Sequence, residues 1–137
     1  PQSFIKAFGE ELIVDKAEKG LHEACKATGA VGGEYTAAPV FMNAEGKCRH
    51  QWVIEFSQQP ADMEAFANAL DLALQHINSD YEAKRHKDIT LQRLEVVTAR
   101  QGLFNDWLKS KGKLGGQHKV PRLSNNRDII DDILKLN

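Results

Sequence analysis

The chain has 137 residues, a formal net charge of −1 at pH 7, and only two cysteines. This length fits one domain with a single hydrophobic core, and two cysteines are too few for a disulfide-stapled secreted scaffold. The sequence has no membrane-length apolar run and no signal-peptide pattern, so we expect no membrane association and a cytoplasmic location. Residue 1 is proline, which leads us to expect a piece of a longer polypeptide.

The first elements are a tight turn and a helix. Gly9 interrupts an apolar segment, which predicts a turn followed by a short strand over residues 11–14. Asp15 and Glu18 have the spacing of a capping box, so we expect a helix that starts at Asp15 and ends at Gly29.

A hairpin is expected next. Residues 31–42 and 48–57 read as strands, with a turn over residues 43–46. In the second strand Trp52, Ile54 and Phe56 alternate with Gln51, Val53 and Glu55. The pattern predicts one face in the core and one face partly in water.

The longest helix is expected to begin at Pro60, because apolar residues recur at helical spacing from there to a charged end at residues 84–87. The following residues, 88–99, are rich in β-branched side chains and predict a further strand. A short helix is expected after Gly102.

A last helix is expected to be capped by Ser124 or Asn125. The resulting order, β-α-β-β-α-β and two more helices, predicts an α+β fold. We expect a small mixed or antiparallel sheet of about four strands in a ferredoxin-like order. Helices would cover one face, with two C-terminal helices added.

The segment before the last helix is basic and rich in glycine. Residues 84–127 contain eleven lysines or arginines and only three acidic residues, and the cations of this segment cluster between residues 109 and 122. Clustered cations repel unless an anion neutralises them, so a phosphate or carboxylate ligand is one interpretation and a solvated loop is the other. The residues of interest are Gly112, Lys113, Gly115, Gly116, Gln117, His118, Lys119, Pro121 and Arg122.

Other function classes find weaker support in the sequence. His22, Cys25, Cys48 and His50 could in principle bind zinc, but helical placement of the first pair disfavours a metal site. Gly112 to Gly115 match the G-x-x-G clamp of KH domains without the apolar residues expected before it, so nucleic-acid binding is not favoured. A small-molecule-sensing domain on the same fold stays open as a third alternative.

Four segments resemble the C-terminal domain of the Gretchen Hagen auxin-responsive family, the acyl-acid amido synthetases of the adenylate-forming superfamily. They are FIKAFGEEL at residues 4–12, NSDYEAKR at 78–85, GLFNDWLKSKGK at 102–113 and GGQHKVPR at 115–122. The last is the most specific, and its His118, where plant members have tyrosine, resembles the bacterial branch.

The resemblance implies that residues 1–137 form the mobile C-terminal domain of a two-step ligase. Its N-terminal domain would bind ATP with Mg²⁺ and a carboxylic acid, form an acyl-adenylate, and pass the acyl group to an amino acid. Lys119 matches the catalytic lysine of adenylation, and Gly9 matches a turn that approaches the active site in the second step. The resemblance also implies nucleotide or substrate contacts at Gly115, Gly116, Gln117 and Arg122. The isolated chain is expected to be inactive.

Overall fold

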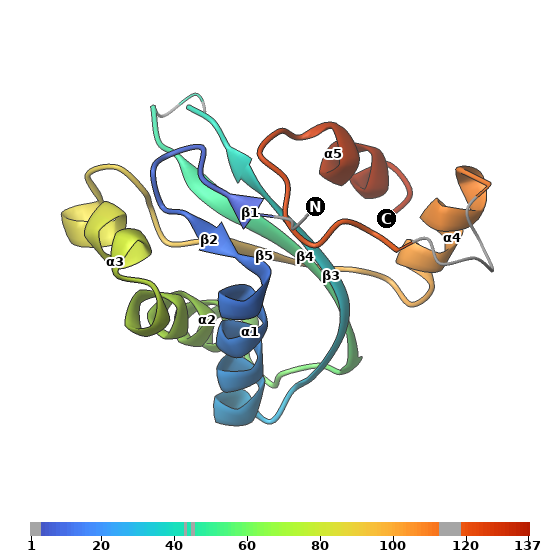
Figure 1. The fold of residues 1–137 in the computed structure, drawn as a ribbon. Coiled ribbons are helices and arrows are strands. Elements are labelled where there is room, and N and C mark those ends of the chain that lie inside the picture. The colour runs from blue at the N-terminus through green and yellow to red at the C-terminus, as the bar shows by residue number, and fades with distance from the viewer. Residues whose placement is uncertain (1–3, 43, 45, 113–118) are drawn as a thin grey trace.

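A three-stranded sheet organises the chain, whose computed structural model describes residues 4–42, 44, 46–112 and 119–137. The strands of this sheet are β3 (Val31–Val40), β4 (Arg49–Gln58) and β5 (Glu95–Thr98), in the order β3-β4-β5. Strands β3 and β4 are antiparallel, with Ala37 opposite Trp52, whereas β4 and β5 are parallel. Figure 1 shows the long, curved β3–β4 hairpin at the centre of the molecule.

The remaining elements lie around this sheet. A second sheet pairs β1 (Phe4–Ile5) with β2 (Leu12–Ile13) in antiparallel register. The helices are α1 (Val14–Thr28), α2 (Met63–Ile77), α3 (Ser79–Arg85), the 3₁₀ helix η1 (His86–Asp88), α4 (Leu103–Ser110) and α5 (Asp128–Leu134). This confirms the α+β class. The expected sheet of about four strands is instead divided into one of three and one of two.

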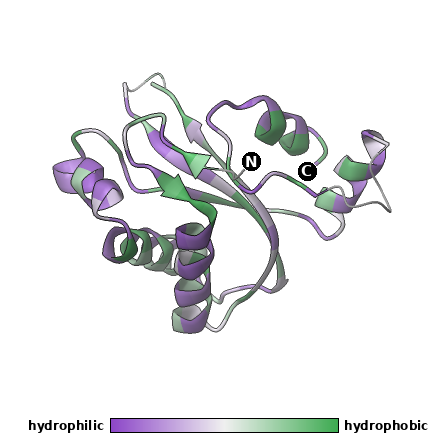
Figure 2. Ribbon diagram, viewed as in Figure 1, coloured by the Kyte–Doolittle hydropathy of each residue, from purple (hydrophilic) through white to green (hydrophobic). Residues whose placement is uncertain are grey.

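Both faces of the main sheet are covered, which corrects the expectation of helices on one face. Trp52, Ile54 and Phe56 pack in one core cluster with residues of α1 and α2. Val53 points to the other face, where it is completely buried in a second cluster with residues of α4 and α5. In Figure 2 much of α2 is hydrophobic, whereas the visible surface of α1 is largely hydrophilic.

Helices α1 and α2 begin at other residues than predicted. Helix α1 begins at Val14 after Ile13, and Asp15 lies in the first turn, so the predicted cap was wrong. Helix α2 begins at Met63 rather than Pro60, because the Asp62 side chain accepts hydrogen bonds from Glu64 N and Ala65 N. Its first turn therefore has a side-chain cap.

The long helix predicted up to residue 84 is divided at Asn78. This side chain accepts hydrogen bonds from Asp80 N and Tyr81 N and so starts α3. At the C-terminus α5 follows Arg127 and has no side-chain cap, so the cap predicted at Ser124 or Asn125 was wrong. Asn126 Oδ1 accepts from Asp128 N at 3.0 Å in the turn before the helix. In the described part of the chain no helix is both long and apolar enough to cross a membrane.

Candidate functional site

The segment that carries Lys119 is fixed to the sheet just after this residue. Leu123 forms a parallel bridge with Ala37 of β3. Ala37 N donates to Arg122 O at 2.9 Å, and Ser124 N donates to Ala37 O at 3.1 Å. Thr36 Oγ1 donates to Pro121 O at 2.7 Å. The edge of β3 thus determines where residues 121–124 lie, although they are far away in sequence.

Arg122 adds side-chain contacts to this attachment. Its guanidinium lies 2.9 Å from the Glu34 carboxylate and donates to Tyr35 O at 3.3 Å. It also lies 4.9 Å from the centre of the Tyr35 ring, at cation–π distance. Arg122 therefore braces the segment from within the domain.

Lys119 itself is exposed and lines a hollow of about 470 Å³ between α4 and α5. None of the described carboxylates forms an ion pair with its ammonium group. The nearby Asp132 carboxylate binds Lys111 Nζ at 2.8 Å and accepts from Trp107 Nε1 at 2.7 Å. These two hydrogen bonds hold the pKa of Asp132 below its ordinary value. Lys119 is thus available to an anion from outside the domain.

Gly9 lies in the turn between β1 and β2, which we call the Gly9 turn (residues 6–11). Gly9 has φ +87°, where glycine is favoured, and its N–H donates to Lys6 O at 3.0 Å. A side chain at this position would lie 3.0 Å from Lys84 Cε of α3. The Asn78 amide donates to Glu10 O at 2.9 Å, so the turn is fastened to the start of α3.

Glu10 and His50 form a completely buried pair that the sequence analysis did not predict. Glu10 Oε2 lies 2.5 Å from His50 Nε2, and both side chains are 0% exposed. Burial alone would raise the pKa of Glu10, but the hydrogen bond and charge of His50 and the backbone N–H of Phe8 hold it below its ordinary value. The sequence did indicate that His50 is buried, because in a strand His50 lies on the same face as Trp52, Ile54 and Phe56.

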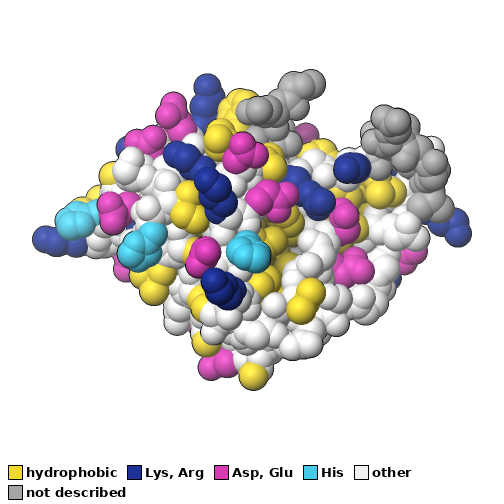
Figure 3. All heavy atoms as spheres, turned by 60° about the horizontal axis from the view of Figure 1, so that its bottom comes forward, with side chains coloured by type: hydrophobic (Ala, Val, Ile, Leu, Met, Phe, Trp, Pro, Cys, Tyr) yellow, Lys and Arg dark blue, Asp and Glu magenta, His cyan; other side chains and the backbone are white. Residues whose placement is uncertain are grey.

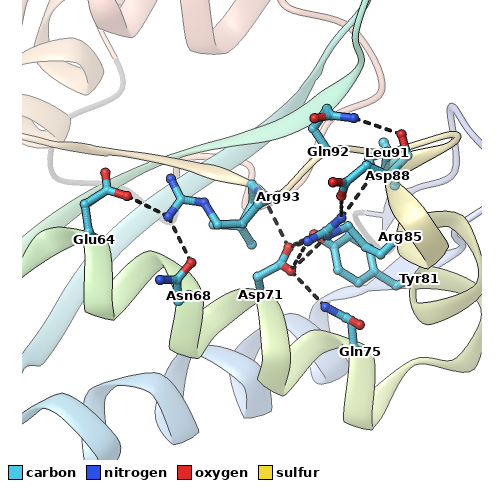
Figure 4. A network of polar contacts seen from close by, with 11 residues as sticks. Glu64, Asn68, Asp71, Gln75, Tyr81, Arg85, Asp88, Leu91, Gln92 and Arg93 are labelled. Atoms are coloured by element: carbon cyan, nitrogen blue, oxygen red, sulfur yellow. Dashed lines mark hydrogen bonds and ion pairs between the residues drawn. The ribbon is translucent and has the colours of Figure 1, made fainter.

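A second buried network surrounds Asp71 of α2, which is 2% exposed (Figure 4). Tyr81 Oη donates to Asp71 Oδ1 at 2.6 Å, and Arg85 Nε donates to both carboxylate oxygens at 3.0 and 2.9 Å. Burial first, and then the charge of Asp71, raise the pKa of Tyr81 well above its ordinary value. Arg85 also binds Asp88 and donates to Leu91 O, so the network joins α2, α3 and the segment before β5.

The sequence and the fold of this chain are similar to those of known proteins. A profile of the GH3 family C-terminal domain matches residues 15–128, most of the chain. The chain belongs to this family. No curated protein sequence matches it.

Two solved structures share the fold of this GH3 domain. One, described as "AtGH3.15 acyl acid amido synthetase in complex with 2,4-DB", has a TM-score of 0.76 and 12% identity over 97% of the chain. The other, "GH3.15 acyl acid amido synthetase", has a TM-score of 0.72 and 15% identity over 98% of the chain. The GH3 domain spans 25% of the length of each of these proteins.

The structure does not bring the predicted site residues of the GH3 domain to one place. Gly9 lies against α3, whereas Lys119 lines the hollow between α4 and α5. Figure 1 shows α3 and α4 at opposite ends of the molecule. Arg122 is close to Lys119 in sequence but is engaged with Glu34. Gly115, Gly116, Gln117 and His118 lie outside the described residues.

The alternative sites of the GH3 domain gain no support from the described residues. His50 binds Glu10, and no group of three or more described His, Cys, Asp or Glu side chains could hold a metal ion. The KH-like motif begins at Gly112 and continues outside the described residues. On the face in Figure 3, lysines and arginines are interspersed with acidic side chains.

Proposed function

We propose that this GH3 domain is the C-terminal domain of an ATP-dependent acyl acid amido synthetase. The family match and the fold shared with two acyl acid amido synthetases support the reaction class. One observation carries the assignment of Lys119: its ammonium is exposed and unpaired among the described residues, on a segment fixed to β3. A fixed, free cation is what an anionic transition state requires.

The rest of the enzyme would be an N-terminal domain in the same polypeptide. The described residues offer a cation for phosphate or carboxylate oxygens but no cluster of acidic side chains for Mg²⁺. We therefore assign the Mg²⁺ site, most of the ATP site and the acid and amino-acid sites to the N-terminal domain. ATP would supply the AMP group that activates the carboxylic acid. We place the enzyme in the reducing cytoplasm, since Cys25 and Cys48 are both free thiols.

In the first step Lys119 would stabilise negative charge that grows on the phosphate and carboxylate oxygens. An ammonium group acts strongly there because the closed cleft excludes water. Pro121 and Arg122 would position Lys119, since both are bonded to β3. Gln117, with Gly115 and Gly116, would contact the nucleotide or substrate.

In the second step the domain would rotate and bring the Gly9 turn to the same cleft. Gly9 packs against α3, whereas Lys119 lines the hollow between α4 and α5, and α3 and α4 lie at opposite ends of the molecule (Figure 1). The two loops would therefore enter the cleft in different orientations of the domain. Rigid-body rotation about a hinge is a common way for enzymes to exchange such loops. The amine of the amino acid would then attack the acyl-adenylate and release AMP.

The test is Lys119→Ala in the full polypeptide that carries this domain. We expect adenylate formation, measured as ATP–pyrophosphate exchange, to fall about 10²- to 10³-fold, as when a charge-stabilising group is removed from other active sites. Carboxylic acids from an aromatic and aliphatic panel serve as substrates. Thermal unfolding should not change, because Lys119 is exposed.

The matched control is Lys109→Ala, which removes an exposed lysine from the last turn of α4. We expect this variant to exchange pyrophosphate at the wild-type rate. Equal rates for wild type and Lys119→Ala would reject the role of Lys119. Absence of exchange by the wild type with every acid would reject the proposed reaction.

A further inference from the structure

The Gly9 turn is held by a carboxylate that lies inside the domain. Glu10 Oε1 accepts from Phe8 N at 2.8 Å, so this side chain closes the turn across Gly9. The other oxygen, Oε2, accepts from His50 Nε2 at 2.5 Å. One carboxylate therefore links the backbone of the turn to β4, which lies 40 residues away in sequence.

Stability alone does not explain this arrangement. Both side chains are completely buried, and His50 Nδ1 has no hydrogen-bond partner in the described part of the chain. A buried ion pair is often no more stabilising than a pair of apolar side chains of the same volume. The pair is therefore better explained by the conformation it enforces than by the stability it adds.

The conformation that it enforces is a strained one. Gly9 has φ +87° and Glu11 has φ +45°, and a positive φ is unfavourable for glutamate. Asn78 supports the turn from α3 by donating to Glu10 O and Glu11 O at 2.9 and 3.4 Å. The His50 ring in turn lies 5.4 Å from the Tyr81 ring, whose hydroxyl binds Asp71.

We infer that Glu10 and His50 are positioning residues for the amide-forming step, because they hold the Gly9 turn in the shape in which it enters the cleft. This inference rests on the proposed function, in which the turn acts only in the second step. Neither residue touches the reacting atoms. Loss of the pair should therefore impair amide formation much more than adenylation.

The test is His50→Leu in the full polypeptide, with both half-reactions measured separately. Adenylation is followed by ATP–pyrophosphate exchange and acyl transfer by trapping with hydroxylamine as the amine. We expect acyl transfer to fall on the order of 10- to 100-fold, as for misplaced active-site groups, and at least tenfold more than exchange. His50→Gln keeps an N–H donor near the position of Nε2 and should recover most of the acyl transfer.

Hydrogen exchange gives a readout that does not depend on activity. In His50→Leu the amides of Phe8 and Gly9 should exchange faster than in the wild type, while the Ala37 amide, bound to Arg122 O, should not change. If the wild type is active but both half-reactions fall equally in His50→Leu, or if His50→Gln recovers nothing, the inference is rejected and the proposed function stands. If the wild type exchanges no pyrophosphate, the proposed function fails, and the positioning role fails with it.

Discussion

At the scale of single residues, Glu10 links the charge of the Gly9 turn to the stability of the fold. Its pKa in the folded protein lies below the ordinary value of 4.5, because the contacts with His50 and Phe8 N outweigh its burial. A carboxyl group with a lowered folded pKa stabilises the protein above the unfolded pKa. This contribution is lost as the pH falls from about 4.5 through the folded pKa.

Glu10→Gln should therefore make the free energy of unfolding depend less on pH in the acid range. Between pH 5 and pH 3 we expect the free energy of unfolding to fall more steeply for the wild type than for Glu10→Gln, as acid titration of a native-state carboxylate requires. Urea unfolding at a series of pH values measures this difference. Glu23→Gln, which changes an exposed carboxylate of α1, should keep the wild-type slope. Parallel profiles for the wild type and Glu10→Gln would contradict the coupling.

Lys119 and the pair of Glu10 and His50 differ in how far the sequence could indicate them. The prediction for Lys119 rests on the GGQHKVPR segment, which lies within eight consecutive residues. Glu10 and His50 are 40 residues apart, and their contact depends on how β4 packs against the Gly9 turn. The ion pair between Arg122 and Glu34 joins residues 88 positions apart, and no sequence pattern predicted it either. Local motifs reveal local chemistry, whereas buried pairs depend on the tertiary fold.

At the scale of elements, the contact between α1 and α2 depends on a glycine. Gly20 is buried in the middle of α1, and a β-carbon there would lie 2.6 Å from Leu74 Cδ2 of α2. In an open helix Gly→Ala stabilises by about 1 kcal/mol, whereas overpacking a core costs about 1–3 kcal/mol. We therefore expect Gly20→Ala to destabilise the domain by about 1 kcal/mol.

Denaturant unfolding of Gly20→Ala tests this prediction, and a double-mutant cycle identifies the cause. Leu74→Ala removes the contacting methyl groups, so adding Gly20→Ala to that variant should no longer destabilise the protein. A stabilising effect of Gly20→Ala in the wild-type background would show that the two helices can separate without cost.

Most helices and strands were predicted correctly from the periodicity of the apolar residues. The errors occurred where a side chain accepts hydrogen bonds from backbone N–H groups and so determines where a helix begins. The spacing of Leu74, Ile77 and Tyr81 continues across Asn78, so the sequence predicted one helix. The Asn78 side chain caps α3 and also donates to the Gly9 turn, which fixes a break at this residue. Asp62 shows the same effect at the start of α2. Capping choices of this kind depend on packing as well as on sequence.

At the scale of the whole molecule, the sheet is buried on both faces because the chain returns to β3 after α4. Val53 was predicted to lie on a partly wet face, but α4 and α5 cover it. This cover depends on the bridge between Ala37 and Leu123, which the local sequence could not predict. The same return places Lys119 beside α4 and α5.

The proposed function requires a larger polypeptide that contains the remaining binding sites. Among the described residues no group of three or more His, Cys, Asp or Glu side chains could hold a metal ion, and Gly9 packs against α3 whereas Lys119 lines the hollow between α4 and α5. We therefore expect residues 1–137 on their own to show no pyrophosphate exchange. The remaining polypeptide, without this domain, should lose the ammonium of Lys119 and with it at least about 10²-fold in exchange rate.

The most direct test of this account is the ATP–pyrophosphate exchange rate of three proteins under the same conditions. These are the full polypeptide, the polypeptide truncated before this domain, and residues 1–137 alone. The account predicts rapid exchange by the first, a rate at least about 10²-fold lower for the second, and none for the third. Exchange by the truncated polypeptide at the rate of the full polypeptide would contradict it.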